Sequence, residues 1–126
     1  MLNFQPKQTT KKLLSSLEER SRDILEKRFG IGTNDSAPRT LESIGENYGI
    51  TRERVRQIEE ASLKRLCQSD AFLSSQNVFG ELKEKIDSLG GVVHEGEFLN
   101  FLTPDSSNQR HVRFLLVIGE PFNNLK

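Results

Sequence analysis

The sequence predicts an all-α protein, and three observations support that prediction. Charged residues make up 29% of the 126 residues and hydrophobic residues 34%, a balance typical of soluble, helix-rich chains. Apolar residues recur at helical spacing in several segments that glycine or proline separates. Two of these segments, 41–48 and 52–66, flank a glycine turn in the arrangement of a helix-turn-helix.

The pattern divides the chain into four parts. Residues 1–13 are predicted to be a flexible lead-in, because polar residues dominate them. Residues 14–68 are predicted to form a helix-turn-helix DNA-binding domain, residues 69–77 a linker, and residues 78–126 a small helical, winged-helix-like domain.

Charge is distributed unevenly along a chain whose formal net charge is zero. The first 66 residues carry 13 basic and 10 acidic side chains, whereas the remaining 60 carry 5 and 8. The two halves therefore differ in sign, which suggests different partners. We expect the acidic second half to dock onto a protein surface, or back onto the basic first half, rather than to bind phosphates.

The first predicted helix begins near a capping box, formed either by Ser16 with Glu19 or by Ser15 with Glu18. It ends at Gly30, because glycine commonly follows the last turn of a helix. Its expected apolar face is Leu17, Ile24 and Leu25, with Phe29 near the end.

The central segment predicts a helix-turn-helix. Thr40 is the expected N-cap of a short helix over 41–48, and Thr51 that of a longer helix from Arg52 to about Leu66. Gly49 stands where the turn needs a left-handed residue. Gly45 is unfavourable inside a helix, and a close crossing of the second helix would explain it.

The last part of the chain is predicted to hold three helices. Apolar spacing indicates one helix over 78–89 and a short one over 95–102. A third helix is expected to start at Ser106 or Ser107 and to run to Ile118. The run FLLVI (114–118) leaves a buried strand as the alternative, since short apolar runs are ambiguous.

The helix starting at Arg52 offers side chains suited to base edges. Arg52, Glu53, Arg56 and Gln57 lie on one patch of its first turns, which is the part that a recognition helix inserts into the major groove. Arginine pairs with guanine, glutamate accepts from cytosine, and glutamine pairs with adenine. The alternative is an ordinary solvated helix face with mixed charges.

Other classes of site lack support in the sequence. Cys67 is the only cysteine, and His94 and His111 are the only histidines, so we expect no metal site and no disulfide. No nucleophile motif, carboxylate pair or phosphate loop indicates an enzyme or a cofactor. The longest apolar run, 114–118, is far too short for a membrane span, and a reduced, cytoplasmic location is expected.

The central residues also resemble a known family. TLESIGENYGITRERVRQIEEASLKRL (40–66) is similar to the helix-turn-helix of region 4 in housekeeping-type bacterial RNA polymerase sigma factors. LEERSRDILEKRFGI (17–31) resembles the first helices of the same region, so the resemblance covers about two fifths of the chain.

The resemblance implies DNA contacts residue by residue. In the family, the recognition helix reads the minus-35 promoter element, a TTGACA-like hexamer. The residues matching its base contacts are Arg52, Glu53, Arg56 and Gln57, and those matching its backbone phosphate contacts are Arg20, Arg28 and Thr40. Arg54 matches a position nearer to activator contacts.

The resemblance also implies protein partners. Region 4 docks onto the flap of the RNA polymerase β subunit, and anti-sigma regulators are a further class of partner. The family's core-binding and promoter-melting regions have no counterpart here, and the chain continues for about 60 residues past the matched segment. It is therefore either a C-terminal fragment of a longer factor or a standalone regulator.

Residues 78–126 faintly resemble the winged-helix domain of the RNA polymerase delta subunit. Two alternative functions stay open beside promoter recognition. One is a protein-docking module that binds polymerase or an anti-sigma partner without reading DNA, and the other is a standalone helix-turn-helix repressor or activator.

Overall fold

The structure, a computed structural model, describes residues 4–32, 37–90, 94–103 and 105–119. These residues form α-helices and no strand, which confirms the predicted all-α class. The helices are α1 (Pro6–Leu14), α2 (Glu19–Phe29), α3 (Leu41–Tyr48), α4 (Arg52–Cys67), α5 (Asp70–Ser74), α6 (Gln76–Ser88), α7 (Glu95–Leu102) and α8 (Ser106–Ile118).

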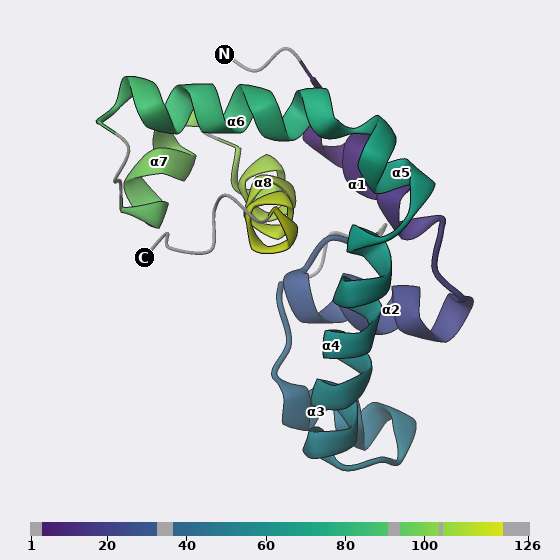
Figure 1. The fold of residues 1–126 in the computed structure, drawn as a ribbon. Coiled ribbons are helices and arrows are strands. Elements are labelled where there is room, and N and C mark those ends of the chain that lie inside the picture. The colour runs from purple at the N-terminus through teal and green to yellow at the C-terminus, as the bar shows by residue number, and fades with distance from the viewer. Residues whose placement is uncertain (1–3, 33–36, 91–93, 104, 120–126) are drawn as a thin grey trace.

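The helices form two connected groups (Figure 1). One end of the molecule consists of α2, α3 and α4, and the other of α6, α7 and α8, with α1 and α5 at the junction. None of the described helices combines the length and apolarity that a membrane span requires.

The predicted flexible lead-in is wrong over residues 6–13, because these residues belong to α1. Pro6 occupies the first turn, where a missing N–H costs nothing. The Thr10 hydroxyl donates to the Pro6 carbonyl over 2.8 Å. Leu13 and Leu14 are buried in a core to which α8 contributes, and that tertiary partner has no signal in the local sequence.

The predicted linker over 69–77 is also wrong in its central part. Ser69 caps α5 by accepting a hydrogen bond from the Phe72 backbone N–H over 3.1 Å. The Phe72 ring then packs against Phe79 of α6, with ring centroids 4.9 Å apart. A serine cap and an aromatic anchor therefore give this short connection a defined path.

The capping box at the start of α2 is wrong as well. The hydroxyls of Ser15 and Ser16 donate to the carbonyls of Lys12 and Leu13, and so they complete the end of α1. The N-cap of α2 is Glu18, whose side chain makes no capping hydrogen bond.

The predicted helices of the last part are confirmed, with α6 starting slightly earlier than expected. The run 114–118 lies in α8, so the strand alternative is wrong. The N-cap of α8 is Asp105 rather than either serine, and its carboxylate accepts from the Ser107 N–H over 3.0 Å.

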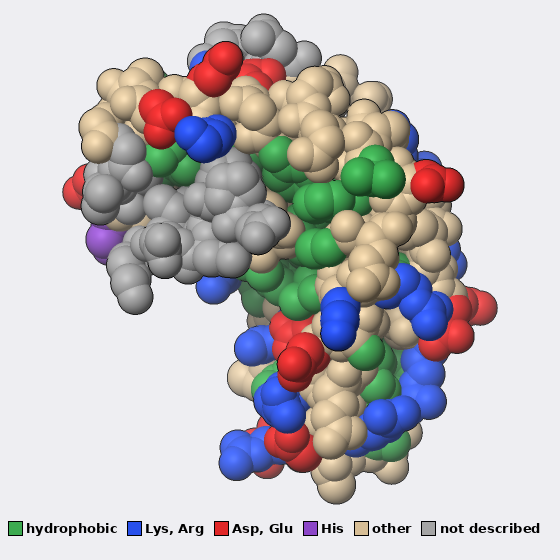
Figure 2. All heavy atoms as spheres, in the orientation of Figure 1, with side chains coloured by type: hydrophobic (Ala, Val, Ile, Leu, Met, Phe, Trp, Pro, Cys, Tyr) green, Lys and Arg blue, Asp and Glu red, His purple; other side chains and the backbone are tan. Residues whose placement is uncertain are grey.

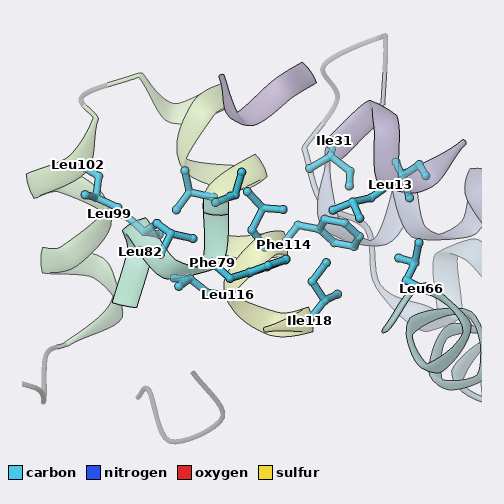
Figure 3. Close-up of a cluster of buried hydrophobic side chains, with 14 of the residues drawn as sticks. Leu13, Ile31, Leu66, Phe79, Leu82, Leu99, Leu102, Phe114, Leu116 and Ile118 are labelled. Atoms are coloured by element: carbon cyan, nitrogen blue, oxygen red, sulfur yellow. The ribbon is translucent and has the colours of Figure 1, made fainter. Parts of the chain in front are cut away.

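The larger core crosses the predicted boundary between the two halves. Figure 3 shows Phe114 of α8 between residues of α6 and α7 on one side and Leu13 and Leu66 on the other. The rings of Phe29 and Phe114 meet edge to face, with centroids 5.0 Å apart. The Arg110 Nε donates to the Gly30 carbonyl over 2.8 Å. The last helices thus pack back onto the first half, mainly through apolar contacts and not through opposite net charge.

The smaller core holds the helix-turn-helix together. It consists of Ile24, Ile44 and Val55, each fully buried, so that α2, α3 and α4 each contribute one residue. Partly buried side chains pack around it, namely Leu41, Tyr48, Ile50 and Ile58. Ile50 thus packs at the corner between the two helices.

The turn between α3 and α4 has the predicted caps. The Thr40 hydroxyl accepts from the Ser43 N–H over 3.0 Å, and the Thr51 hydroxyl accepts from the Arg54 N–H over 3.1 Å. Gly49 has a φ of 69°, the left-handed conformation that side chains with a Cβ rarely adopt.

The close crossing predicted at Gly45 is present. A Cβ on this residue would lie 2.7 Å from the Ile50 carbonyl oxygen, which is too near for a backbone atom that cannot swing away. We therefore expect Gly45→Ala to lower the free energy of unfolding by about 1–2 kcal/mol, because overpacking outweighs the gain in helix propensity of about 1 kcal/mol.

Urea denaturation followed by circular dichroism measures this effect. Gly80→Ala is the matched control, since a Cβ on Gly80 in α6 meets nothing within 4 Å. That variant should be more stable than the parent by about 0.5–1 kcal/mol. If both substitutions stabilise the protein equally, the backbone around Gly45 accommodates the added methyl group without a loss of stability.

Candidate DNA-binding surface

The first turns of α4 carry the predicted base-reading side chains. Arg52, Glu53, Arg56 and Gln57 are all exposed, whereas Val55 between them is buried in the smaller core. The helix therefore presents its polar face to solvent because its apolar side is held by α2 and α3. Figure 2 shows basic and acidic side chains gathered at this end of the molecule.

Arg56 is held by two carboxylates. Its Nη2 lies 2.6 Å from Oε1 of Glu53, and its Nη1 lies 2.9 Å from Oε2 of Glu60. The hydrogen bond from Arg56 lowers the pKa of the Glu53 carboxyl, and the same bond raises the pKa of Arg56. Both groups are therefore charged at neutral pH and are partnered to each other before any ligand arrives.

One hollow brings most of the predicted residues together. Arg28, Thr40, Arg52, Glu53 and Arg56 line it, with Leu41 and Glu42. Two helix N-termini and the end of α2 thus meet at one place on the surface. Its arginines and the threonine at a helix N-terminus can bind an anionic group, while Glu42 and Glu53 add acceptors to the same hollow.

Two predicted residues lie elsewhere. Arg20 and Gln57 line a second hollow, between α2 and α4, together with Arg54 and Arg65. Arg20 also lies over the Tyr48 ring, with its guanidinium carbon 5.6 Å from the ring centroid. The seven predicted residues therefore divide between two hollows rather than forming a single patch.

Arg28 is fixed by contacts that the sequence does not indicate. Its Nε lies 3.4 Å from Oε1 of Glu59, and its Nη1 donates to the Arg39 carbonyl over 3.1 Å. Sequence analysis missed Glu59 and Glu42 at this site. Glu42 had a local signal, since it follows the capping Thr40 directly, whereas Glu59 is 31 positions from Arg28 and had none.

A polar cluster links α2 to α3 beside this surface. The Tyr48 hydroxyl donates to the Asp23 carboxylate, and Lys27 Nζ lies 2.6 Å from Asp23 Oδ2. Burial, together with the hydrogen bond to Asp23, raises the pKa of Tyr48 to about 12. Burial alone would raise the pKa of Asp23, but the hydrogen bonds from Lys27 and Tyr48 outweigh it and lower that pKa.

This cluster makes stability depend on pH in two windows. The contribution of Tyr48 is complete below its ordinary pKa of about 10 and is lost as pH rises towards 12. The contribution of Asp23 is present above its ordinary pKa of about 3.9 and is lost as pH falls below that value. We expect Tyr48→Phe to cost about 1 kcal/mol at pH 7 and less at pH 3, because the hydroxyl helps to lower the pKa of Asp23 and that contribution declines in acid.

Urea denaturation of the parent and Tyr48→Phe at pH 3 and pH 7 measures the difference. The partial exposure of the cluster keeps the expected cost at the low end of the range for hydrogen bonds to charged groups. A cost that stays the same at both pH values would mean that the hydroxyl does not act through the Asp23 carboxylate.

Other parts of the surface offer less chemistry. A hollow of about 490 Å³ between α1, α2 and α8 is lined by none of the seven predicted residues. Among the described residues, no three His, Cys, Asp or Glu side chains lie close enough together to hold a metal ion.

Comparison with known families identifies the segment that carries this surface. Residues 13–67 match the sequence model of Sigma-70, region 4, which is somewhat under half of the chain. The match includes α2, α3 and α4 with the whole of both arginine-lined hollows, but excludes α6, α7 and α8.

Curated relatives match the same segment. RNA polymerase sigma factor SigA of a Bacillus species is 43% identical over 60 residues, which is 48% of this chain and 15% of that protein. The SigA of a Nostoc species is 47% identical over 55 residues, 44% of this chain and 14% of that protein. The sigma factor RpoD of Helicobacter pylori is 46% identical over 54 residues, 43% of this chain and 8% of that protein.

The chain thus matches at most about a seventh of the length of these relatives. Within that segment the resemblance predicted from the sequence is confirmed. Residues 13–67 of this chain are similar to region 4 of the sigma-70 factors.

Proposed function

We propose that this protein recognises a minus-35-type promoter element in duplex DNA and links that element to RNA polymerase. The observation that carries the proposal is the hollow in which Arg52, Glu53 and Arg56 of α4 meet Arg28 and Thr40. The similarity of residues 13–67 to Sigma-70, region 4 supports it.

In the proposed complex, the N-terminal turns of α4 enter the major groove. Arg52 pairs with guanine through O6 and N7, and Glu53 accepts from the amino group of cytosine. Arg28 and Thr40, at the edge of the same hollow, bind backbone phosphate and set the register of the helix on the duplex. In this complex the base contacts of α4 provide sequence discrimination, and the phosphate contacts of Arg28 and Thr40 add affinity.

The hollow lined by Arg20 and Gln57 is proposed to face the DNA strand on the other side of the major groove. A helix in the major groove has a phosphate backbone on each side, and the two hollows flank α4. Arg20 and Gln57 thus face the opposite strand, where Arg20 is proposed to bind phosphate and Gln57 a base edge.

Arg56 reaches its base only by exchanging partners. In the free protein its guanidinium is occupied by Glu53 and Glu60. The pairs are exposed and thus weak, so a base edge in a partly dehydrated groove competes well with them.

The protein partner is proposed to be the RNA polymerase core, through the flap of its β subunit, with anti-sigma regulators as further partners of the same region. The role contains no catalytic step, and it places the protein in the bacterial cytoplasm with its promoters. Binding recruits polymerase and adds affinity and register.

Fluorescence anisotropy tests the DNA proposal. A labelled duplex carrying TTGACA is compared with the same duplex scrambled, at low and moderate salt. We expect tighter binding to the hexamer, with a preference that survives added salt. Equal and steeply salt-dependent binding to both duplexes would leave only phosphate attraction.

Capture of polymerase distinguishes the alternative functions. A protein that brings down core polymerase but binds neither duplex is a protein-docking module. One that binds DNA without capturing core polymerase is a standalone repressor or activator.

Substitution of Glu53 tests the base reading within this proposal. We expect Glu53→Ala to relax discrimination at one base pair by about 1–3 kcal/mol, because the carboxylate no longer selects cytosine. Total affinity should change less, since the removed carboxylate also repelled phosphates. Anisotropy with single-base variants of the hexamer measures this. Discrimination unchanged at every position would exclude Glu53 from the readout.

A further inference from the structure

Glu59 of α4 points away from the exposed reading face. Its side chain is only 16% exposed, compared with 59% for Glu53 and 73% for Glu60 on the same helix. Its carboxylate faces α2, where Oε1 lies 3.4 Å from Nε of Arg28. Glu59 is therefore a largely buried acid placed behind the proposed DNA surface.

Arg28 is held at two points by this arrangement. The Glu59 carboxylate forms an ion pair with the guanidinium at Nε, which is buried and itself makes no hydrogen bond to the described residues, and the Arg39 carbonyl accepts a hydrogen bond from Nη1 over 3.1 Å. The anchors come from α4 and from the segment before α3, so the side chain is fixed between the two elements of the helix-turn-helix. The guanidinium has five N–H donors, and the hydrogen bond to the Arg39 carbonyl uses one of the two on Nη1.

The held guanidinium lies where the proposed site needs a phosphate contact. Arg28 lines the same hollow as Thr40 and Arg52. An unrestrained arginine loses side-chain freedom when it binds, whereas one already held in place loses less. Glu59 therefore favours binding through Arg28, although its own negative charge opposes the approach of DNA.

We infer that Glu59 is a positioning residue that holds Arg28 ready to bind a backbone phosphate beside the reading helix. The inference rests on the proposed function and extends it to a residue that does not itself touch DNA. This inference predicts a change in DNA affinity opposite to the one expected from net charge alone. Removing a carboxylate near DNA should tighten binding, but removing this one should weaken it.

The test compares Glu59→Gln, which keeps the shape and removes the charge, with Arg28→Ala, the double variant and the control Glu84→Gln on the exposed face of α6. Anisotropy is measured with the TTGACA duplex and its scrambled form at several salt concentrations. Circular dichroism confirms that each variant is folded at the temperature used.

We expect Glu59→Gln to bind both duplexes about three- to tenfold more weakly, as for loss of one charge-assisted contact. The slope of log K against log salt should decrease in magnitude by up to about 0.9, the value for one phosphate contact. In the Arg28→Ala background the same substitution should no longer weaken binding. Glu84→Gln should behave like the parent.

Arg28→Lys provides a second test if Glu59→Gln fails to fold. Lysine keeps the positive charge, but its single ammonium group has to serve Glu59, the Arg39 carbonyl and a phosphate in place of a planar guanidinium, so we expect the same weakening. Parent-like binding by a folded Arg28→Lys would overturn the inference.

The remaining outcomes separate the inference from the proposed function. If Arg28→Ala weakens binding while Glu59→Gln tightens it, Glu59 only repels DNA, and the inference fails while the phosphate contact stands. If Glu59→Gln weakens binding equally with and without Arg28, Glu59 acts by another route and the inference also fails. If Arg28→Ala binds like the parent, the proposed phosphate contact itself is wrong.

Discussion

Phe114→Ala is expected to lower the free energy of unfolding by about 3–5 kcal/mol, the usual cost of truncating a buried aromatic side chain. Phe114 is fully buried and meets Phe29 edge to face, so its ring joins α8 to the end of α2. The loss combines burial of the ring, the cavity left behind and the aromatic contact.

Two probes show whether this loss reaches the helix-turn-helix. Tyr48 is the only tyrosine and the chain has no tryptophan, so its fluorescence reports on α3, while circular dichroism reports on all helices. We expect both urea transitions to shift together. Val117→Ala, on the same helix but 42% exposed, is the control and should change stability by less than about 0.5 kcal/mol.

A Phe114→Ala protein in which the tyrosine transition stays in place would contradict this expectation. The smaller core of Ile24, Ile44 and Val55 would then hold α2, α3 and α4 together without the C-terminal helices.

Arg52→Ala is expected to remove about 1–3 kcal/mol of the preference for TTGACA over the scrambled duplex, because the bidentate contact with guanine is lost. This corresponds to roughly a five- to 150-fold loss in the ratio of the two affinities. Affinity for the scrambled duplex should fall less, since only one cation is removed. Anisotropy with both duplexes measures the ratio directly.

Two further arginines serve as controls for charge. Arg113→Ala, on α8 and paired with Glu95, removes the same charge away from both α4 hollows and should preserve preference and affinity. Arg54→Ala removes it from the same turn as Arg52 but from the second hollow, and it should preserve the preference. If Arg52→Ala still prefers TTGACA over the scrambled duplex, a side chain other than Arg52 discriminates between the two sequences.

Much of the helix-turn-helix is predictable because its signals are local. The Thr40 and Thr51 caps, the left-handed Gly49 and the constrained Gly45 all act on neighbouring backbone, and each is present in the structure. The exposure of Arg52 and Glu53 follows from helical spacing around the buried Val55. Their contacts with DNA remain predictions.

The predictions from sequence are wrong where a mostly polar segment packs against an apolar helix far along the chain. Residues 6–13 are rich in lysine and threonine, which predicts a flexible segment, yet Leu13 joins a core to which α8 contributes. Such a segment is stabilised by burying a few side chains against another helix, and no local pattern reveals that helix.

The all-α class, the helix-turn-helix and the side chains on the exposed face of α4 are predictable from the sequence, because capping, glycine conformation and helical periodicity act within a few residues. Three features came only from the tertiary structure: the C-terminal helices share a core with the first half, Arg20 and Gln57 line a different hollow from the other five residues, and Glu59 lies beside Arg28. These features depend on contacts between residues tens of positions apart, which form only when packing brings the helices together.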